Sequence, residues 1–181
     1  MKKIIFITGN KGKLKEAREI LEGFDIINRE IDLPEIQETD ARKVIEAKLL
    51  EARRHHKGEY IIEDTSLYFD CLNGLPGPLI KWFLEKLGQE KLFTIAKKLN
   101  NFTAEAKTIV GHMDSRGKIK YFEGSVKGKI SSPKGTGGFG WDQIFIPKGY
   151  KKTFGEMRPE EKHKISMRKK AFQKLANYLN K

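Results

Sequence analysis

The hydrophobic pattern at the start of the chain changes its period twice. Residues 2–7 are mostly apolar and are followed by a turn, which is typical of a short buried strand. Over residues 11–21 the apolar side chains recur at helical spacing, and Gly23 ends that segment. Residues 24–31 are largely apolar again. The chain is therefore predicted to open with a strand, a helix and a second strand.

Asp40 is predicted to cap a second helix that runs to about Lys57. The inward positions of this helix are predicted to be Val44, Ala47, Leu49 and Leu50. Residues 60–62 are apolar and predict a strand that ends at Glu63 and Asp64. These two acids are therefore expected at a strand end.

The second half of the chain predicts further helices and strands, separated by glycine and proline. In order, they are a helix after the turn at 76–78 that breaks at Gly88, a helix over 90–99, antiparallel strands over 103–114 and 118–127, a glycine-rich stretch over 135–142, a strand over 143–146 and a basic helix over about 164–179. No repeat or linker interrupts them. Residues 1–181 are therefore predicted to form one α/β domain with a mixed sheet and flanking helices.

The composition fits a single globular domain. A chain of 181 residues is within the range that one hydrophobic core serves, and 11 Phe, five Tyr and two Trp argue against disorder. No stretch is long and apolar enough for a membrane span or a secretion signal. Cys71 is the one cysteine, so it cannot form a disulfide within the chain. This favours the reducing cytoplasm and a role for Cys71 as a small buried apolar residue.

The chain is strongly basic, with a formal net charge of +12. Residues 1–18 contribute +5 and residues 148–181 contribute +8, whereas the residues between them sum to −1. The two terminal segments are therefore expected to converge on an anion, either a nucleic-acid backbone or a small polyphosphate. A solvated, lysine-rich surface of the kind found in thermophiles would explain the charge alone equally well.

The turn between the first predicted strand and helix is a candidate phosphate site. Its six residues are Thr8, Gly9, Asn10, Lys11, Gly12 and Lys13. A helix N-terminus points its first N–H groups at a ligand, and the two lysines add positive charge. The spacing is not that of a P-loop, because only two residues separate the glycines. An ordinary strand-to-helix turn is the alternative.

Carboxylates form a candidate metal site. Glu63 and Asp64 are adjacent on a strand and so point to opposite faces, which allows one to bind a metal while the other is structural. Glu35 follows another predicted strand. Acids beside a basic phosphate site favour Mg²⁺, which needs few protein ligands, although solvated or ion-paired acids are the alternative. Zinc is disfavoured because the histidines and the cysteine lack ligand spacing; they are His55, His56, His112, His163 and Cys71.

The glycine-rich stretch ends in residues that suit a nucleobase, namely Phe139, Gly140, Trp141 and Asp142. Glycine lets the backbone approach a ligand, an aromatic ring can stack on a base, and a carboxylate can accept a hydrogen bond from a base N–H. Lys162, Ser166 and Arg168 lie at the start of the basic helix. The alternatives are a bend lined by core aromatic residues and a solvated helix face.

Together these segments form an ordered series of six motifs. They are Thr-Gly-Asn-x-x-Lys at 8–13, Asp-Leu-Pro-Glu at 32–35, Glu-Asp-Thr at 63–65, Gly-Leu-Pro-Gly-Pro at 74–78, Phe-Gly-Trp-Asp at 139–142 and Ser-x-Arg at 166–168. Over essentially its whole length the chain resembles the inosine triphosphate pyrophosphatase family. The resemblance implies an elongated fold with two lobes around a central cleft, a homodimer, and Mg²⁺-dependent hydrolysis of ITP, dITP and XTP to the nucleoside monophosphate and pyrophosphate.

The resemblance also implies roles for individual residues. Asp64 would activate the attacking water and, with Glu35, hold the metal. Residues assigned to the triphosphate and to other substrate contacts are Thr8, Gly9, Asn10, Lys11, Gly12, Lys13, Lys48, Thr65 and Lys81, of which Lys48 and Lys81 lie outside the motifs. Residues assigned to the base pocket are Phe139, Gly140, Trp141, Asp142, Lys162, Met167 and Arg168. Met167 stands where many relatives have histidine, so a backbone contact there would survive and an imidazole contact would not.

A basic nucleic-acid-binding domain is the alternative function. It would account for the charge of +12 and for the aromatic loop. It would not account for carboxylates beside that charge, and the sequence has no RNP, helix-turn-helix or zinc-finger signature. We therefore expect a cytoplasmic nucleotide hydrolase with no stable nucleic-acid partner and no membrane partner.

Overall fold

The computed structural model of the chain describes residues 2–55 and 58–181, which form both strands and helices. The strands are β1 (Lys3–Ile7), β2 (Asp25–Arg29), β3 (Tyr60–Phe69), β4 (Pro76–Gly77), β5 (Thr103–Met113), β6 (Ile119–Ile130) and β7 (Phe145–Pro147). The α-helices are α1 (Lys11–Ile20), α2 (Ala41–His55), α3 (Ile80–Lys98), α4 (Pro159–Ile165) and α5 (Met167–Leu179). Turns of 3₁₀ helix cover Asp70–Leu72 and Asp142–Ile144.

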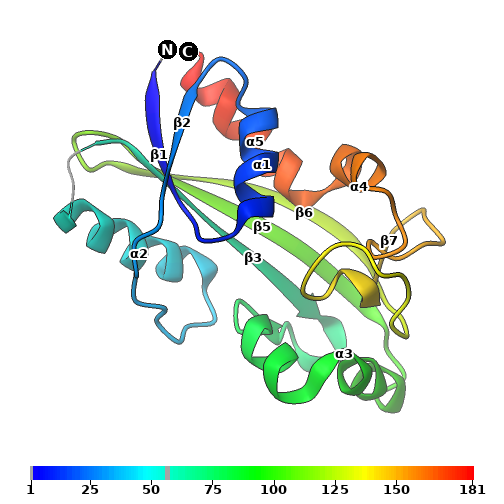
Figure 1. The fold of residues 1–181 in the computed structure, drawn as a ribbon. Helices are drawn as coiled ribbons and strands as arrows, with labels where there is room; N and C mark the ends of the chain where they lie inside the picture. The colour runs from blue at the N-terminus through cyan, green and yellow to red at the C-terminus, as the bar shows by residue number, and fades with distance from the viewer. Residues whose placement is uncertain (1, 56–57) are drawn as a thin grey trace.

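The described strands form one mixed sheet in the order β2-β1-β3-β5-β6-β7, with β4 paired to β3. β1 is parallel to β2 and β3, whereas β3, β5, β6 and β7 are antiparallel neighbours. Figure 1 shows that β3, β5 and β6 run the length of an elongated molecule, from the end with α1, α2 and α5 to the end with α3 and β7. The predicted α/β fold with a mixed sheet is confirmed, including the parallel β-α-β opening.

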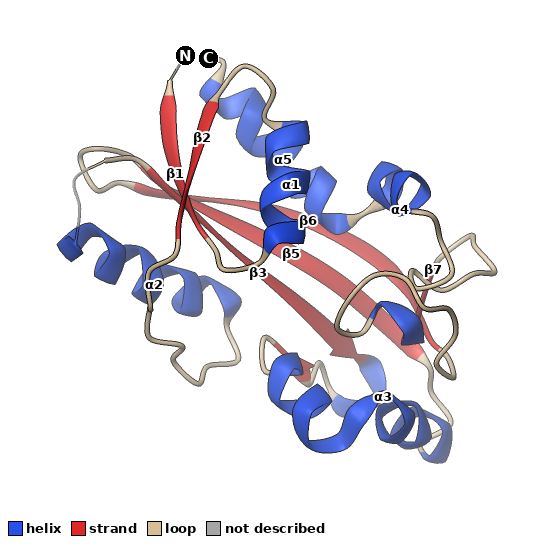
Figure 2. Cartoon of the chain, in the orientation of Figure 1, coloured by secondary structure: helices blue, strands red, loops and turns tan. Residues whose placement is uncertain are grey.

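Helices cover both faces of the sheet (Figure 2). α2 packs on one face, where Ile45 and Leu49 share a buried cluster with Ile62 of β3. α1 and α5 cover the other face, and the rings of Phe6 and Phe172 meet edge to face at 5.9 Å. Because successive side chains of a strand point to opposite faces, β3 contributes residues alternately to the α2 side and to the α1/α5 side.

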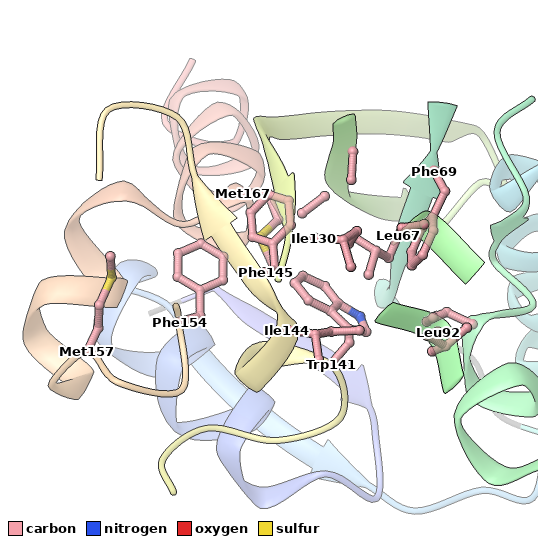
Figure 3. Close-up of a cluster of buried hydrophobic side chains, with 14 residues drawn as sticks. Leu67, Phe69, Leu92, Ile130, Trp141, Ile144, Phe145, Phe154, Met157 and Met167 are labelled. Carbon is pink, nitrogen blue, oxygen red and sulfur yellow. The ribbon is translucent and has the colours of Figure 1, made fainter. Parts of the chain in front are cut away.

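A third buried cluster fills the end of the molecule near β7 (Figure 3). Trp141, Phe145 and Phe154 pack together there, with ring centroids 5.3 to 6.4 Å apart. Met167 of α5 belongs to the same cluster. The glycine-rich stretch is therefore anchored in the core through Trp141, while Phe139 remains 42% exposed.

Two predictions for β3 and α2 are wrong. β3 continues to Phe69 because every residue from 60 to 69 pairs with β5, so Glu63 and Asp64 lie in the middle of the strand. In α2, Leu50 is 49% exposed and Ala47 is only half-buried. The sheet-facing stripe runs instead through residues spaced by three or four, namely Ala41, Val44, Ile45, Leu49 and Ala52. The predicted helix end at Lys57 lies outside the described residues.

The basic helix predicted over about 164–179 is present as α5 but begins later, at Met167, and a short helix that was not predicted, α4, precedes it. α4 ends at Ile165 and α5 begins at Met167, with Ser166 in an extended conformation between them. The Ser166 side chain accepts the N–H of Lys169 and so caps the start of α5. The strand predicted over 143–146 also begins later, at Phe145, because the preceding residues form a 3₁₀ turn.

Three smaller expectations concern Gly88, Cys71 and membrane spans. α3 breaks at Gly88, as predicted, with φ of 72° and ψ of 170°. Cys71 is half-buried rather than buried and packs against the cluster shown in Figure 3. No helix among the described residues is long and apolar enough to cross a bilayer.

Candidate active site

A cavity of about 810 Å³ lies where loops follow the parallel strands β1 and β2. We call it the lysine cavity, because Lys13, Lys48 and Lys81 line it. Its other polar and glycine lining residues are Thr8, Gly9, Asn10, Asp32, Glu35 and Glu63. Residues from three predicted motifs therefore meet in one place, together with the two lysines that no motif fixes.

Side chains of the turn after β1 hold its shape. Thr8 Oγ1 accepts the N–H of Asn10 at 3.1 Å, and Asn10 Oδ1 accepts the N–H of Lys13 at 3.0 Å. Asn10 is thus the N-cap of α1. A Cβ atom added to Gly9 would meet nothing within 4 Å. The backbone at Gly9 is therefore open to a ligand.

Two predicted members of this turn do not line the lysine cavity. Lys11 is exposed, and Gly12 lies beside Phe139, whose Cε1 would be 3.9 Å from an added Cβ. Both residues belong to the first turn of α1, where each successive side chain is rotated by about 100° around the helix axis. The lysine cavity is therefore lined from this segment by residues 8–10 and Lys13 alone.

Glu35 joins two lysines from different helices. Its Oε1 lies 3.1 Å from Nζ of Lys48 in α2, and its Oε2 lies 3.2 Å from Nζ of Lys81 in α3. Burial alone would raise the pKa of Glu35, but the charge and hydrogen bond of Lys48, with those of Lys81, outweigh burial and lower it. Glu35 is therefore a carboxylate held ionised between two cations.

Asp64 points to the face of β3 opposite Glu63 and accepts the hydroxyl hydrogen of Ser66 at 2.9 Å. Burial raises the pKa of Asp64, and the charges of Lys13 and Lys48 together with the Ser66 hydrogen bond reduce this increase. A carboxylate with a raised pKa accepts a proton more readily than an ordinary aspartate does.

Glu63 is enclosed on the α1/α5 side. Its side chain has no exposed surface, and it contacts Arg168, Lys13 and Thr65. Burial alone would raise the pKa of Glu63, but the charges of Arg168 and Lys13 and the hydrogen bonds from Arg168 and Thr65 lower it to about 2. Glu63 is therefore an ionised partner of two cations at neutral pH.

A second cavity of about 370 Å³ adjoins the first. We call it the aromatic cavity, because Phe139 and Trp141 line it with Gly140, Asp142, Lys162, Met167 and Arg168. Thr65 also lines it, and Asn10, Lys13 and Lys81 line both cavities. The two cavities are therefore two halves of one cleft.

Asp142 holds the aromatic loop in place. Its Oδ2 accepts the N–H of Phe139 at 2.7 Å and lies 2.6 Å from Nζ of Lys162. The Lys162 ammonium and the Arg168 guanidinium lie 4.9 and 5.4 Å from the centroid of the Phe139 ring. Asp142 is predicted to accept a hydrogen bond from a base N–H. Its Oδ2 atom, however, already has two protein donors.

Arg168 is buried, with 1% of its surface exposed. Its Nε and Nη2 donate to the two oxygens of Glu63 at 2.9 and 3.1 Å, and its Nη1 donates to Glu16 at 2.8 Å. Burial alone would lower the pKa of Arg168, but the charges and hydrogen bonds of Glu63 and Glu16 outweigh burial and raise it above the usual arginine value. A guanidinium carries five N–H donors, so two remain after these three bonds.

The break at Ser166 places a helix N-terminus beside Arg168. Lys170 donates the first backbone hydrogen bond of α5, to the carbonyl of Ser166. The N–H groups of Met167 and Arg168 precede it and are those that a helix leaves without an intrahelical partner. The Met167 side chain belongs to the buried cluster, so the backbone is the part of Met167 that can serve a ligand.

The sequence did not predict roles for three residues around this cleft. Glu16 contacts Arg168, Trp82 lines the lysine cavity, and Nε2 of Gln89 donates to the carbonyl of Gly140 at 2.6 Å. The helix break at Gly88 was the one available signal, because it precedes Gln89 directly. Contacts between residues 51 or 152 positions apart leave no pattern in a single sequence.

Of the predicted metal ligands, Glu35 lines this cleft, whereas Asp64 lines neither cavity and is buried within the electrostatic reach of Lys13 and Lys48, which do line it. Glu63 is unsuited, because both of its oxygens accept bonds from Arg168. Within residues 2–55 and 58–181, no group of three or more histidine, cysteine or acidic side chains is placed to bind an ion. Mg²⁺ usually takes one or two carboxylates and completes its shell with water and substrate phosphate, so this donor set fits Mg²⁺ and not a zinc site.

Sequence comparisons find relatives of nearly the same length. The Ham1 family matches residues 4–178. A Schizosaccharomyces pombe protein named inosine triphosphate pyrophosphatase is 40% identical over 181 residues, covering 99% of this chain and 96% of the relative. A Saccharomyces cerevisiae protein of the same name is 41% identical over 187 residues, covering 97% and 95%.

Comparisons with solved structures agree. The Staphylococcus aureus Ham1 protein superposes with a TM-score of 0.87 at 25% identity, covering 99% of this chain and 98% of that one. A Mycobacterium abscessus protein described as a nucleoside-triphosphatase / dITP/XTP pyrophosphatase has a TM-score of 0.77 at 27% identity, covering 96% and 98%. Likeness in sequence and likeness in fold therefore lead to the same group of proteins.

Proposed function

The chain belongs to the Ham1 family, and we propose that it is an inosine triphosphate pyrophosphatase. It hydrolyses the noncanonical purine nucleoside triphosphates ITP, dITP and XTP to the monophosphate and pyrophosphate, and so removes them from nucleotide pools. The observation that carries the proposal is one cleft with three lysines in one half and two aromatic rings and an arginine in the other. A polyphosphate and a purine need these two environments side by side.

The lysine half of the cleft is proposed to bind the triphosphate. Lys48 and Lys81 contact Glu35, and Lys13 contacts Glu63. A triphosphate takes over these lysines as its own counterions, so binding exchanges one set of ion pairs for another and isolates no charge. The Thr8–Asn10 turn adds the N–H of Gly9 beside the N-terminus of α1, because the N–H groups of Thr8 and Asn10 already donate to Arg29 and Thr8.

Glu35 and Asp64 are proposed to hold Mg²⁺. When bound, the ion neutralises charge on the polyphosphate and orients it, which contributes several kcal/mol to catalysis. Glu35 suits this role because it is already ionised and because Lys48 and Lys81 can leave it for the phosphates.

Asp64 is proposed to take the proton of the attacking water. The water oxygen bonds to the α-phosphorus, and the bond from that phosphorus to the oxygen of the β-phosphate breaks. Pyrophosphate leaves with the electron pair, and the water proton passes to the Asp64 carboxylate. The raised pKa of Asp64 supports this assignment, and the charges of nearby Lys13 and Lys48 oppose the effect of burial and favour the ionised form.

The aromatic half of the cleft is proposed to bind the base. Phe139 offers a ring on which any purine can stack. The two remaining N–H donors of Arg168 and the N–H of Met167 suit an oxo group at the purine 6-position. The methionine that replaces the common histidine is therefore compatible with a backbone contact at position 167.

We extend the proposal to a homodimer in the cytoplasm. The dimer rests on the family resemblance, and the cytoplasm rests on the single cysteine of the chain. Light scattering of the purified protein tests the dimer. The single chain has a mass of 20.8 kDa. A measured mass close to this value would contradict the dimer and would not affect the proposed chemistry.

The reaction is tested by incubating the protein with ITP and Mg²⁺ and identifying the first products. We expect IMP and pyrophosphate in equal amounts, no directly formed orthophosphate, and no turnover after EDTA treatment. Lys48→Ala should lower kcat/KM by about 10²-fold, as the loss of one preorganised donor does. Lys98→Ala, at the exposed end of α3, is the matched control and should not change it. IDP and orthophosphate as first products would overturn the proposal.

A further inference from the structure

Glu63 lies where the two halves of the cleft meet, and the proposed reaction gives it no role. It is in the middle of β3, and its side chain has no exposed surface. Two cations from distant parts of the chain contact it, Lys13 from α1 and Arg168 from α5. Lys13 lines the lysine cavity, and Arg168 lines the aromatic cavity. Glu63 therefore joins one residue of each half.

The two cations share one oxygen of Glu63. Oε2 accepts Nε of Arg168 at 2.9 Å. Oε1 accepts Nη2 of Arg168 at 3.1 Å and the hydroxyl of Thr65 at 2.7 Å, and Nζ of Lys13 lies 3.3 Å from the same atom. A change in the hold of either cation on Oε1 therefore alters how firmly the other is held.

We propose that Glu63 is a positioning residue that couples purine recognition to triphosphate binding, an inference that rests on the proposed function. A phosphate that draws the Lys13 ammonium toward itself leaves Oε1 to Arg168, whose two-pronged contact then tightens. In the reverse direction, a tighter contact between Arg168 and Glu63 weakens the hold of Glu63 on Lys13. Lys13 is then easier to transfer to a phosphate. Linkage requires the two effects to be equal in size.

Neighbouring acids lack the contacts for this role. Glu16 contacts only Nη1 of Arg168 and reaches no residue of the lysine cavity. Asp64 points to the opposite face of β3. Burial also matters, because charges that water cannot reach interact more strongly than exposed pairs do. Among the described acids, Glu63 alone contacts both Arg168 and a lysine that lines the lysine cavity.

Inorganic pyrophosphate is the probe that isolates the coupling, because it carries no base. Its dissociation constant is measured by calorimetry in the wild type, Arg168→Ala, Glu63→Gln and the double variant. In the presence of Glu63, the loss of Arg168 should weaken pyrophosphate binding by about fivefold, because Glu63 then holds Lys13 alone. In the Glu63→Gln background, the same loss should change the dissociation constant by less than about twofold.

Three comparisons make the result decisive. Glu59→Gln removes another acid with two ion-pair partners, Lys2 and His112, away from the cleft, and in that background Arg168→Ala should keep its full effect. Glu63→Asp, which keeps the charge on a shorter side chain, replaces Glu63→Gln if thermal unfolding shows that the amide variant does not fold, and should reduce the effect of Arg168→Ala. ITP turnover by the wild type is measured separately.

An unchanged pyrophosphate affinity in Arg168→Ala would overturn the coupling. An effect of equal size with and without Glu63 would also overturn it, because the arginine charge would then act directly through space. Either result with an active wild type leaves the proposed function standing, whereas a wild type without ITP turnover overturns the proposed function itself.

Discussion

Lys162 and Asp142 form a buried ion pair in which Nζ lies 2.6 Å from Oδ2. Their side chains are only 10% and 3% exposed. The same Oδ2 atom accepts the N–H of Phe139, and the Lys162 ammonium faces the Phe139 ring. This pair therefore fixes the ring that we propose to stack on the purine, and it ties the aromatic loop to α4.

Asp142→Asn should destabilise the protein and weaken ITP binding together. The amide can still accept the Phe139 N–H, but Lys162 is left as a buried cation without its counterion, which costs about 3 kcal/mol. Urea denaturation measures the first effect, and KM for ITP measures the second. Adding Lys162→Met to Asp142→Asn removes the unpaired charge and should restore most of the stability. If the single variant is as stable as the wild type, the pair does not fix the loop.

Asp64→Asn should abolish turnover while nucleotide affinity stays within about tenfold of the wild type. Asparagine keeps the shape of aspartate but cannot take a proton and ligates Mg²⁺ more weakly. Single-turnover assays measure the chemistry, and calorimetry with ITP measures the affinity. Circular dichroism must show a folded variant, because a merely structural acid would lower activity by unfolding. Near-normal turnover would remove Asp64 from the mechanism.

The wild-type pH profile provides a second test of Asp64. The base works when ionised, so kcat/KM should fall as the pH drops through its pKa, and burial raises that pKa above the usual aspartate value. The acid limb should therefore lie at a higher pH than an ordinary aspartate would give. A limb at or below the ordinary value would point to another base.

The parts of the cleft that follow from the sequence are those that local patterns determine. The turn at Thr8–Asn10 follows a buried run and precedes an amphipathic one, so both its conformation and its place at the end of β1 are predictable. The aromatic loop is also predictable, because its glycines lie close together in the sequence. Side-chain partnerships are different, because Arg168 and Glu63 are 105 positions apart and no local pattern relates them.

The errors have the same origin. Asp64 and Ser66 are weak signals for a strand by themselves, yet β3 continues through them because β5 lies alongside and completes the hydrogen bonds. Leu50 fits a helical stripe when α2 is taken alone, but the sheet selects the stripe through Ile45 and Leu49. Tertiary contacts decided both cases.

Gln89→Ala should raise KM for ITP several-fold and leave kcat nearly unchanged. The Gln89 side chain donates to the Gly140 carbonyl, between Phe139 and Trp141, so its loss frees the loop from α3 without touching the phosphates. A hydrogen bond of this kind contributes about 1 kcal/mol, or about fivefold in an equilibrium. Gln173→Ala, on the exposed face of α5, is the matched control. Equal KM values in the two variants would show that the loop does not depend on α3.

Glu63→Gln should make stability less sensitive to acid. The folded-state pKa of Glu63 is about 2, below the ordinary value of 4.5. A lowered carboxyl pKa stabilises the fold fully above the unfolded-state value, and this contribution is lost as the pH falls from about 4.5 toward 2. The difference corresponds to about 3 kcal/mol. Urea denaturation at pH 6 and at pH 2.5 should therefore show a larger loss in the wild type than in Glu63→Gln, and parallel losses would contradict the assigned pKa.

The last prediction concerns the choice of purine. We expect the enzyme to accept ITP and XTP and to cleave ATP and GTP much more slowly. The N–H donors of Arg168 and of the backbone at Met167 can pair with a 6-oxo group, but they meet the 6-amino group of adenine donor to donor. An unpaired buried donor costs about 1–3 kcal/mol, and sites built on such pairing can reject a wrong ligand by about 10⁴-fold.

GTP tests the limits of this argument, because guanine also carries a 6-oxo group and Arg168 cannot exclude it. Its rejection must come from the 2-amino group, at a wall that still tolerates the 2-oxo group of XTP. Phe139 stacks on every purine and so adds affinity without selectivity. Discrimination should therefore be strong against ATP and weaker against GTP. Arg168→Ala should reduce the discrimination against ATP and leave that against GTP unchanged. Values of kcat/KM for the four triphosphates in both proteins decide the matter, and if the wild type cleaves ATP as well as ITP, Arg168 does not read the 6-position.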